Sequence, residues 1–485
     1  MKTDRLFNDV NILSVSGKMP DDIEFITDNS EKVTEKCLFF CRKGNNYDGE
    51  KYIYEAINKG AEIIVSEDNL SVDICFVKVK DIKSAMARIA MNFSNNAQKK
   101  LKKIGVVGTN GKTTTCHFLS QIFTENGNKT AVIGTIGNYI DGVKYDTELT
   151  TPSLLELYKL MEKSVDEGVE VFIMEISAHA IEQRRTEGIV FDAIIFTNCT
   201  EDHLDYFKTF EEYERVKMSI FDYDHCALGI INSDDETGRK ILSNKDLPMS
   251  ASYGLYNPSD VFALNVDEGK NGLKYTVNLF DNVYNISSPI IGLYNVYNSL
   301  AAAACAATLG VDMGRIVSAL EKLKSVEGRC QNVASFRGAN IFVDYAHTPD
   351  GLERTLLSMR KICSGKLICV FGCGGNREKE KRPKMGKISG KLADFTIITS
   401  DNPRYENPDD IISEIEKGMV EVGGDYVVRT DRRMAVKLAV GLLNVGDVLL
   451  IAGKGAEKYQ EINGVKYDFS DEKIVLSVIG ALSEN

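Results

Sequence analysis

Residues 104–115, IGVVGTNGKTTT, decide the fold of this chain. The four apolar residues at their start are typical of a buried strand, and the run CHFLSQIF that follows is compatible with a helix. Glycines at such a strand-to-helix turn let backbone N–H groups approach phosphate oxygens. The sequence therefore predicts a phosphate loop, although Val106 stands where the strict GxxxxGK[ST] pattern requires glycine.

Two side chains of this loop carry chemistry. Lys112 can reach the β- and γ-phosphates of ATP, and Thr113 can place its hydroxyl on Mg²⁺. The alternative is a glycine-rich turn before an ordinary helix, but strand, loop, lysine, hydroxyls and helix follow one another in the expected order. The loop residues predicted to bind ATP are Gly108, Thr109, Asn110, Gly111, Lys112, Thr113 and Thr114.

Strand-like apolar runs alternate with helix-length segments along the whole chain. This rhythm predicts an α/β fold with parallel sheets, in which ligands bind at the carboxyl ends of the strands. A lysine-rich stretch at 97–103 and the segment 325–333 mark two boundaries, which gives three predicted domains: 1–98, 99–328 and 329–485. The predicted strands are 104–107, 171–176, 193–197, 367–371, 395–399 and 448–452.

Composition excludes several classes of protein. A formal net charge of -12 and a pI near 5.2 argue against nucleic acid as the main ligand. The chain has no apolar run of signal-peptide or membrane-spanning length, so we expect a cytoplasmic protein with no membrane insertion. Eleven cysteines without a CxxC pair indicate a reducing compartment. The spacings Cys37/Cys41 and Cys369/Cys373 allow a metal, but no ligand cluster lies near either pair.

A second polar cluster follows two of the predicted strands. Glu175 ends the strand at 171–176, and His203 and Asp205 follow the strand at 193–197. A carboxylate and an imidazole at neighbouring strand ends can hold Mg²⁺ against phosphates, whereas a hydrogen-bonded loop histidine is the alternative for His203. In the helix-compatible run FEEYERVKMSIF, Lys217 lies on one face with Tyr213 and Phe221; by chemistry alone it would be a solvated lysine.

The loop GTNGKTTT and the segment TNCTEDHLDYF together resemble the Mur ligases and their folylpolyglutamate synthetase relatives, and the resemblance covers nearly the entire chain. It implies an N-terminal UDP-recognition domain, a central ATP-binding domain and a C-terminal amino-acid-binding domain. It also implies that Lys217 is carbamylated (N6-carboxylysine) and helps to hold a second Mg²⁺. The implied catalytic residues are Lys112, Glu175, His203 and Lys217, and the implied metal ligands are Thr113, Glu175, His203 and the Lys217 carbamate.

The same resemblance supplies further nucleotide contacts. The segment 292–304, GLYNVYNSLAAAA, matches the part of Mur ligases in which asparagines approach the nucleotide. Asn295 and Asn298 are the candidates, with a simple helix N-cap as the alternative. Arg329 matches the hinge arginine of the family, and Asp344 and His347 match residues that close over ATP.

The N-terminal stretch 33–67 resembles the UDP-recognition domain of the MurE and MurF types. Ser30 is retained just before it, but Glu31 stands where an arginine is usual, which puts a uridine contact in doubt. A doubled arginine on a solvated helix is the alternative for 184–185. The residues implied to bind the UDP-MurNAc-dipeptide are Ser30, Thr150, Thr151, Ser177, Gln183 and Arg185.

The C-terminal motifs distinguish among Mur ligases. The tetrad DNPR at 401–404 resembles the motif that accompanies meso-diaminopimelate, whose distal carboxylate suits an arginine fork. Ala456 departs from the usual GKGHE, so L-lysine stays open as the added amino acid. The stretch GCGGNR at 372–377 does not match the dinucleotide-binding pattern GxGxxG, because Arg377 occupies the position of the third glycine. The implied amino-acid contacts are Arg377, Asp401, Asn402, Pro403, Arg404, Gly453 and Glu457.

The resemblance thus implies an ATP- and Mg²⁺-dependent ligase of the MurE type. Its substrates would be UDP-MurNAc-L-Ala-D-Glu and meso-diaminopimelate, joined through an acyl phosphate during peptidoglycan synthesis, and we expect a monomer. A folylpolyglutamate synthetase would need neither a UDP domain nor DNPR. A regulatory module would bind ATP alone and would release no phosphate in response to an amino acid.

Overall fold

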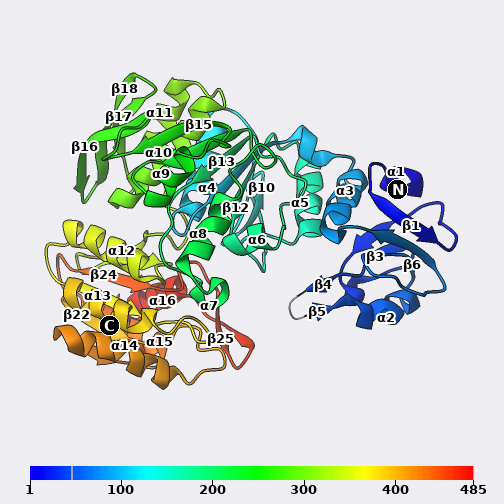
Figure 1. The fold of residues 1–485 in the computed structure, drawn as a ribbon. Helices are drawn as coiled ribbons and strands as arrows, with labels where there is room; N and C mark the ends of the chain where they lie inside the picture. Colours follow the sequence, from blue (N-terminus) through cyan, green and yellow to red (C-terminus); the bar gives the residue numbers. More distant parts are fainter. Residues whose placement is uncertain (45–46, 484–485) are drawn as a thin grey trace. The chain divides into compact units, whose positions relative to one another are not determined.

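The computed structural model describes residues 1–44 and 47–483, whose path is drawn in Figure 1. Asn45 and Asn46, part of the stretch that resembles a UDP-recognition domain, lie outside the described residues. The chain forms two compact units. The first holds Met1–Gly105, Asn128–Ala193 and Asp222–Ala227, and the second holds Val106–Gly127, Ile194–Phe221 and Leu228–Asn485. The domain boundaries after residues 98 and 328 stay predictions.

The N-terminal part of the first unit is a five-stranded sheet in the order β1-β7-β6-β3-β2. Its strands run parallel except β1, which is antiparallel to β7. Helix α3 (Ile82–Phe93) follows the sheet and is capped by Asp81, whose carboxylate accepts the backbone N–H groups of Lys83 and Ser84. The strands are β1 (Ile12–Ser16), β2 (Phe25–Thr27), β3 (Cys37–Phe40), β6 (Ala61–Ser66) and β7 (Cys75–Val79).

The remainder of the first unit contains the strand order β11-β10-β9-β12. Strand β12 (Val171–Ile176) is parallel to β9 (Thr130–Gly134), while β10 (Gly137–Ile140) is antiparallel to both β9 and β11 (Val143–Tyr145). Every residue of β12 is buried, so both faces of this strand are covered, as is typical of parallel sheets. Glu175 is the exception in this apolar strand, since it is a buried carboxylate.

The second unit contains two strand systems. In the first, β13, β14, β15 and β16 are parallel neighbours, and β17 and β18 extend them as an antiparallel meander. Helix α10 (Leu293–Thr308) packs against α4 (Lys112–Glu125), which starts at the phosphate loop. The strands are β13 (Ala193–Phe196), β14 (Leu228–Asn232), β15 (Met249–Gly254), β16 (Val261–Gly269), β17 (Gly272–Leu279) and β18 (Asn282–Ser288).

The second strand system is the C-terminal sheet, in the order β19-β20-β24-β21-β22-β23, with only β19 antiparallel to its neighbour. Alternate residues face opposite sides: Cys369 packs with one set of helices, and Val370 with another. Figure 1 shows these helices around the sheet. The strands are β19 (Gln331–Phe336), β20 (Ala339–Asp344), β21 (Leu367–Phe371), β22 (Phe395–Ile398), β23 (Tyr426–Val428) and β24 (Val448–Ala452).

Two buried clusters cover that sheet. One contains side chains of α12 (Pro349–Ile362), α13 (Lys381–Leu392) and α14 (Pro408–Val422). The other contains side chains of α15 (Arg432–Gly441) and α16 (Asp471–Ser483). A mostly parallel sheet with helices on both faces directs its polar strand ends to one edge, where ligands bind in such folds.

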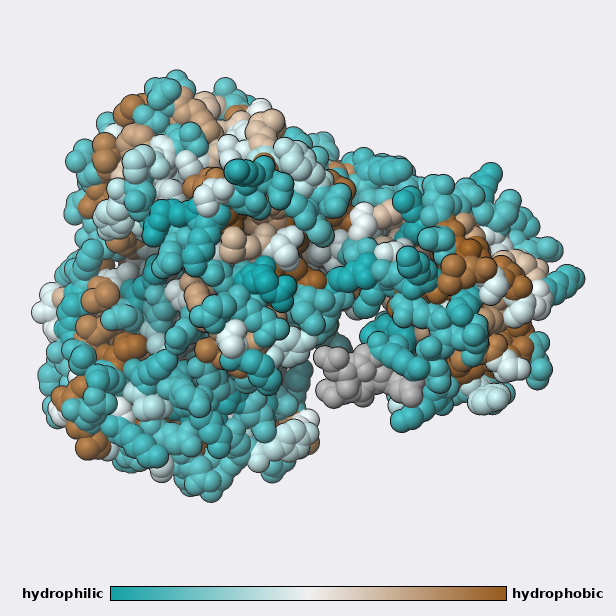
Figure 2. Space-filling model, in the orientation of Figure 1, coloured by the Kyte–Doolittle hydropathy of each residue, from teal (hydrophilic) through white to brown (hydrophobic). Residues whose placement is uncertain are grey.

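The predicted α/β class is confirmed. All six predicted strands exist within two residues of their expected bounds, at β8 (Lys102–Val107), β12, β13, β21, β22 and β24. Helix α8 (Phe210–Met218) ends before Phe221, so the expectation that Phe221 shares a helix face with Lys217 was wrong. In the described residues no helix is both long and apolar enough to cross a bilayer. The face drawn in Figure 2 is largely hydrophilic with separate apolar patches.

Candidate active site

The phosphate loop lies between β8 and α4. Gly111 has φ of +88°, a backbone conformation that favours glycine, and Lys112 begins the helix. The ammonium of Lys112 donates to the carbonyls of Gly108 at 2.8 Å and Thr109 at 2.9 Å. The loop therefore presents a cation and the N-terminal end of a 14-residue helix at one place, as phosphate binding requires.

Asn295 and Asn298 lie inside α10 and are buried. Gly292 is the residue that precedes the helix, so the alternative that these asparagines form an N-cap was wrong. The Asn298 amide donates to Asn295 Oδ1 at 2.9 Å, and a Cβ on Gly111 would lie 2.5 Å from Asn298 Oδ1. Asn298 thus lies against the phosphate loop, and Gly111 has to be glycine for that reason as well.

Lys217 is fully enclosed behind the same loop. Its Nζ donates to Thr109 Oγ1 at 2.6 Å, lies 3.7 Å from Cys199 Sγ and sits 3.9 Å from the centre of the Tyr213 ring. Burial lowers the pKa of Lys217 to about 8. The interpretation as a solvated surface lysine was wrong, since only 1% of the residue is exposed. A buried amine that is readily deprotonated is the form that reacts with CO₂ to give a carbamate.

The loop after β13 brings a buried carboxylate that sequence reasoning did not single out. Asp202 is 7% exposed, and its Oδ2 lies 3.4 Å from His203 Nε2. Burial alone would raise the pKa of Asp202, but His203, His347 and Lys381 together lower it to about 2. Burial lowers the pKa of His203. Asp205, which was also expected here, is exposed.

The hinge residues reach the phosphate loop. Arg329 Nη2 donates to Thr113 Oγ1 at 3.0 Å, and its guanidinium stacks 4.1 Å from the centre of the Tyr345 ring. Asp344, at the end of β20, accepts the backbone N–H of Cys330 at 2.6 Å. Burial lowers the pKa of His347 to about 4, so its ring is neutral near pH 7. Through its hydrogen bond with the Cys330 N–H, Asp344 fixes the turn from which Arg329 projects.

A second set of predicted residues lies together in the first unit. Glu175 is buried, and its carboxylate accepts the Thr135 backbone N–H at 2.8 Å and hydroxyl at 3.1 Å. The Thr135 hydroxyl also lies 3.1 Å from that of Thr150. Thr151 donates to the backbone carbonyl of Glu175 at 2.9 Å. Glu175 therefore has an environment of hydroxyl groups.

Arg185 extends this cluster. Its Nη1 donates to the Thr151 carbonyl at 2.8 Å, and its Nη2 donates to Gln183 Oε1 at 2.7 Å. Ser177 caps α6 (Ala178–Glu182) by accepting the Ala180 N–H. Ser30 belongs to the N-terminal sheet region instead, where it donates to Glu55 Oε2 at 3.2 Å. The alternative of a solvated arginine pair fits neither Arg185 nor Arg184, which bridges Asp81 and Glu187.

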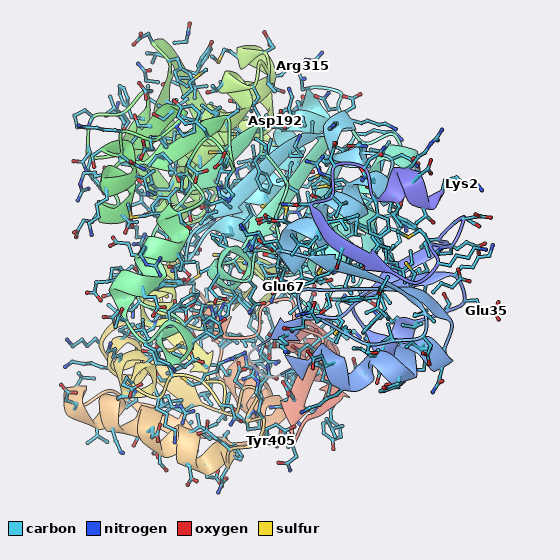
Figure 3. The ribbon with its side chains drawn as sticks, turned by 45° about the vertical axis from the view of Figure 1, so that its right-hand side comes forward. Lys2, Glu35, Glu67, Asp192, Arg315 and Tyr405 are labelled. Carbon is cyan, nitrogen blue, oxygen red and sulfur yellow. The ribbon has the colours of Figure 1, made fainter. Side chains whose placement is uncertain are left out.

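The C-terminal sheet carries the predicted amino-acid contacts at its strand ends. A Cβ on Gly374 would lie 2.9 Å from Arg404 Nη1 and 3.7 Å from Arg377 Cγ, so the two arginines flank one glycine. Arg377 is exposed, whereas Arg404 donates to the Gly375 carbonyl at 2.9 Å and pairs with Glu461 at 3.2 Å. Tyr405, the next residue, is exposed at the surface and labelled in Figure 3.

Asn402 and Glu457 form a hydrogen-bonded group with the buried Lys454. Lys454, whose side chain is 0% exposed, donates to Asn402 Oδ1 at 2.9 Å and to Glu457 Oε2 at 2.8 Å. The Asn402 amide donates to the same carboxylate oxygen at 2.9 Å. Gly453 has φ of +113°, and a Cβ there would lie 2.6 Å from Asp401 Oδ2. Pro403 follows Asn402 and is buried with it.

Sequence reasoning missed four residues near the predicted sites: Asp202 after β13, and Lys381, Lys454 and Glu461 in the C-terminal sheet region. Lys454 stands inside the quoted GKGAE motif, directly after a buried strand, so its position was a usable signal. Asp202 adjoins His203 and was equally visible. No pattern indicated Glu461, because its pairing with Arg404 depends on β25 (Tyr459–Ile462), which is joined to residue 404 by a bridge.

Fold and site define a nucleotide-dependent ligase, and comparison with known proteins gives the family. Three family models match the chain. Residues 22–107 match "Mur ligase family, catalytic domain", residues 106–306 match "Mur ligase middle domain", and residues 328–455 match "Mur ligase, glutamate ligase domain". The chain belongs to the Mur ligase family, whose members are ATP-dependent ligases.

Full-length relatives narrow the resemblance. The chain is 39% identical over 486 residues to UDP-N-acetylmuramoyl-L-alanyl-D-glutamate--2,6-diaminopimelate ligase 1 of Clostridium acetobutylicum, covering 99% of this chain and 100% of that protein. A solved structure of a ligase with the same named substrates is 30% identical, with a TM-score of 0.69 over 98% of each chain. Folylpolyglutamate synthase of Mycobacterium tuberculosis shares the fold at 16% identity and a TM-score of 0.64, over only 76% of this chain.

Proposed function

We propose that this protein adds meso-2,6-diaminopimelate to UDP-N-acetylmuramoyl-L-alanyl-D-glutamate at the expense of ATP, a step of peptidoglycan synthesis. The full-length similarity to ligases named for this reaction carries the proposal. The pair Arg377 and Arg404 beside Asn402 and Glu457 supports the choice of amino acid, because meso-diaminopimelate has a distal carboxylate and ammonium where L-lysine has only the ammonium. L-Lysine is the alternative substrate.

Two bond exchanges make up the proposed reaction. An oxygen of the D-glutamate side-chain carboxylate attacks the γ-phosphorus of ATP, and ADP leaves. The amine of the incoming amino acid then attacks the acyl carbon, phosphate leaves, and the proton lost by the amine passes to solvent. Lys112 and the α4 N-terminus would bind the phosphates, and Thr150, Thr151, Ser177, Gln183 and Arg185 would orient the muropeptide, with Ser30 at its uridine end.

A magnesium requirement is part of the proposal. Oxygen donors suit this ion: the Asp202 carboxylate and the Thr113 hydroxyl of the second unit offer them, and so does the Glu175 carboxylate of the first unit, while His203 would be a nitrogen ligand. The described residues contain no cluster of three or more His, Cys, Asp or Glu side chains arranged for a metal. A carboxylate added to Lys217 as carbamate would supply a further oxygen ligand. When bound, Mg²⁺ neutralises phosphate charge. Lys217 itself is held for this by Thr109.

We further propose that the protein acts as a monomer in the cytoplasm. Eleven cysteines that form no disulfide are compatible with a reducing compartment.

The decisive experiment measures phosphate release from ATP with the UDP-MurNAc-dipeptide and, separately, meso-diaminopimelate, L-lysine or L-ornithine. We expect release only with meso-diaminopimelate at a substantial rate. Preference for L-lysine would reject the proposed amino acid. Release that does not depend on an amino acid would indicate an ATPase, and no release with any amino acid would fit a regulatory module.

A further inference from the structure

We propose that Lys381 is a catalytic residue that, together with Lys112, binds the phosphoryl group during its transfer. This inference rests on the proposed function. Lys381 is the first residue of α13, and it is 8% exposed. It lies in the segment FGCGGNREKEKRPKMG at 371–386, but the sequence predicts a role only for Arg377 of that segment.

The position of Lys381 is fixed by its neighbours in the helix. The next residue, Arg382, has a side chain that is 0% exposed and donates to Glu406 at 2.9 Å and to Glu414 at 2.9 Å, which ties the start of α13 to α14. Lys384 lies one turn further on the same face as Lys381 and pairs with Glu201 at 2.9 Å. Glu201 directly precedes Asp202 and His203. The face of α13 that carries Lys381 therefore contacts the 201–203 loop.

The charge of Lys381 has no protein partner of the ordinary kind. Among residues 1–44 and 47–483, none accepts a hydrogen bond from its ammonium or forms an ion pair with it within 4.0 Å. Its charge is nevertheless close enough to contribute to lowering the pKa values of Asp202 and His347, and to offset part of the rise that burial causes in the pKa of the Glu378 carboxyl. A nearly buried lysine normally pairs, because leaving the ammonium without a partner costs several kcal/mol. A cation without such a partner beside the 201–203 loop is positioned for an anion.

Phosphoryl transfer supplies that anion. As the carboxylate oxygen bonds to the γ-phosphorus and the bond to ADP breaks, negative charge is spread over the three outer oxygens of the phosphoryl group. Lys112 comes from the phosphate loop, and Lys381 comes from the C-terminal sheet region. Lys381 forms and breaks no covalent bond. It stabilises the same oxygens in the acyl phosphate until the amine displaces phosphate.

The test uses Lys381→Met, which keeps the length of the side chain and removes its charge. Removing a preorganised charge-stabilising donor lowers kcat by about 100- to 1,000-fold in enzymes. We expect that loss, with less than threefold change in KM for meso-diaminopimelate. Exchange of ¹⁸O between the bridging and nonbridging positions of ATP, measured with the dipeptide and no amino acid, should fall equally. Lys381→Arg should recover at least a tenth of the activity, and Lys384→Ala, from the same helix face, should stay within threefold of the original.

Thermal unfolding separates this role from a structural one. Lys381→Met should unfold within a few degrees of the original protein, because its ammonium forms no hydrogen bond or ion pair in the described residues that the substitution would break. A Lys381→Met protein with unchanged kcat, or with reduced kcat but unchanged isotope exchange, would overturn the inference. If the original protein does not turn over the dipeptide and meso-diaminopimelate at all, the proposed function fails and this inference fails with it.

Discussion

Lys217 combines burial with a hydrogen bond to a hydroxyl rather than to a carboxylate, and this decides how its charge affects stability. Its pKa falls from an ordinary 10.5 to about 8 because burial disfavours the ammonium. Below pH 8 the folded protein must hold a buried cation at a cost of roughly 3 kcal/mol. Between pH 8 and 10.5 the unfolded chain binds more protons than the folded one, so the free energy of unfolding rises with pH as this cost disappears.

Lys217→Met should therefore stabilise the protein. At pH 7, in buffer free of CO₂, we expect a gain of roughly 1 to 3 kcal/mol in the free energy of unfolding by urea. The gain should shrink toward pH 10.5, where Lys217 is neutral in both states. A variant less stable than the original at pH 7, or a gain that does not change with pH, would mean that the lysine is not held as proposed.

We expect the selection of the amino acid to depend on the side chain of Arg404. It has φ of +51° and already pairs with Glu461, so its guanidinium is held in place before substrate arrives. Removing one partner of a buried charge pair costs ~2 to 5 kcal/mol. Arg404→Ala should lower kcat/KM for meso-diaminopimelate by roughly 30-fold to a few thousand-fold, with KM for ATP nearly unchanged. Arg433→Ala, an exposed arginine, is the control, and equal losses in both variants would exclude a specific contact.

At the scale of elements, α15 and α16 are joined by a fully buried ion pair. Arg432 donates to both carboxylate oxygens of Asp471, at 2.9 and 2.8 Å, and to the Ala452 carbonyl at the end of β24. Its Nη1 lacks a hydrogen-bond acceptor and lies 3.9 Å from Asp401 Oδ2, which also lacks a donor. The pair thus connects two helices to the strand end that carries the predicted amino-acid contacts.

Arg432→Ala should lower the free energy of unfolding by about 3 to 5 kcal/mol, because it leaves the Asp471 carboxylate buried and unpaired. Urea denaturation measures the loss. The double variant Arg432→Met, Asp471→Leu should recover most of it, since an apolar pair of similar volume needs no partner charge. Equal instability of the single and double variants would show that packing, and not the charge, holds α15 to α16.

The elements also show how far sequence reasoning reaches. Strands such as β12 and β24 were predicted to the residue because each is a buried apolar run that ends at a polar motif. The grouping of side chains within a single motif could be predicted as well, because those residues are neighbours in the sequence. What sequence could not give were meetings between distant elements: Asn298 against Gly111, Arg404 with Glu461, and Lys381 beside the 201–203 loop. These depend on tertiary packing, which leaves no local period.

At the scale of the molecule, one glycine of the second unit lies between the residues predicted to bind the nucleotide and those predicted to bind the amino acid. Gly328 has φ of +66°, and a Cβ there would lie 2.0 Å from the backbone nitrogen of Ala456 and 2.5 Å from the carbonyl carbon of Gly455. The next residue, Arg329, donates a hydrogen bond to Thr113. The segment that Gly328 approaches, Gly455 and Ala456, leads directly to Glu457. Backbone atoms cannot give way as a flexible side chain can, so a methyl group at 328 must displace one segment or both.

Gly328→Ala should consequently raise KM for ATP and for meso-diaminopimelate together, each by about tenfold or more, since an energy of about 1.4 kcal/mol at each site suffices. Gly423→Ala is the matched control, because Gly423 has φ of +65° and nothing within 4 Å of the added Cβ. Both variants carry the cost of a non-glycine residue at positive φ, about 1 to 2 kcal/mol, so their unfolding free energies fall by a common amount. Only Gly328→Ala adds the clash, which costs a further 1 to 3 kcal/mol or so. Were the two variants to show the same KM values, the 328–329 turn and the 453–457 loop would be independent, and closure over ATP would not position the amino acid.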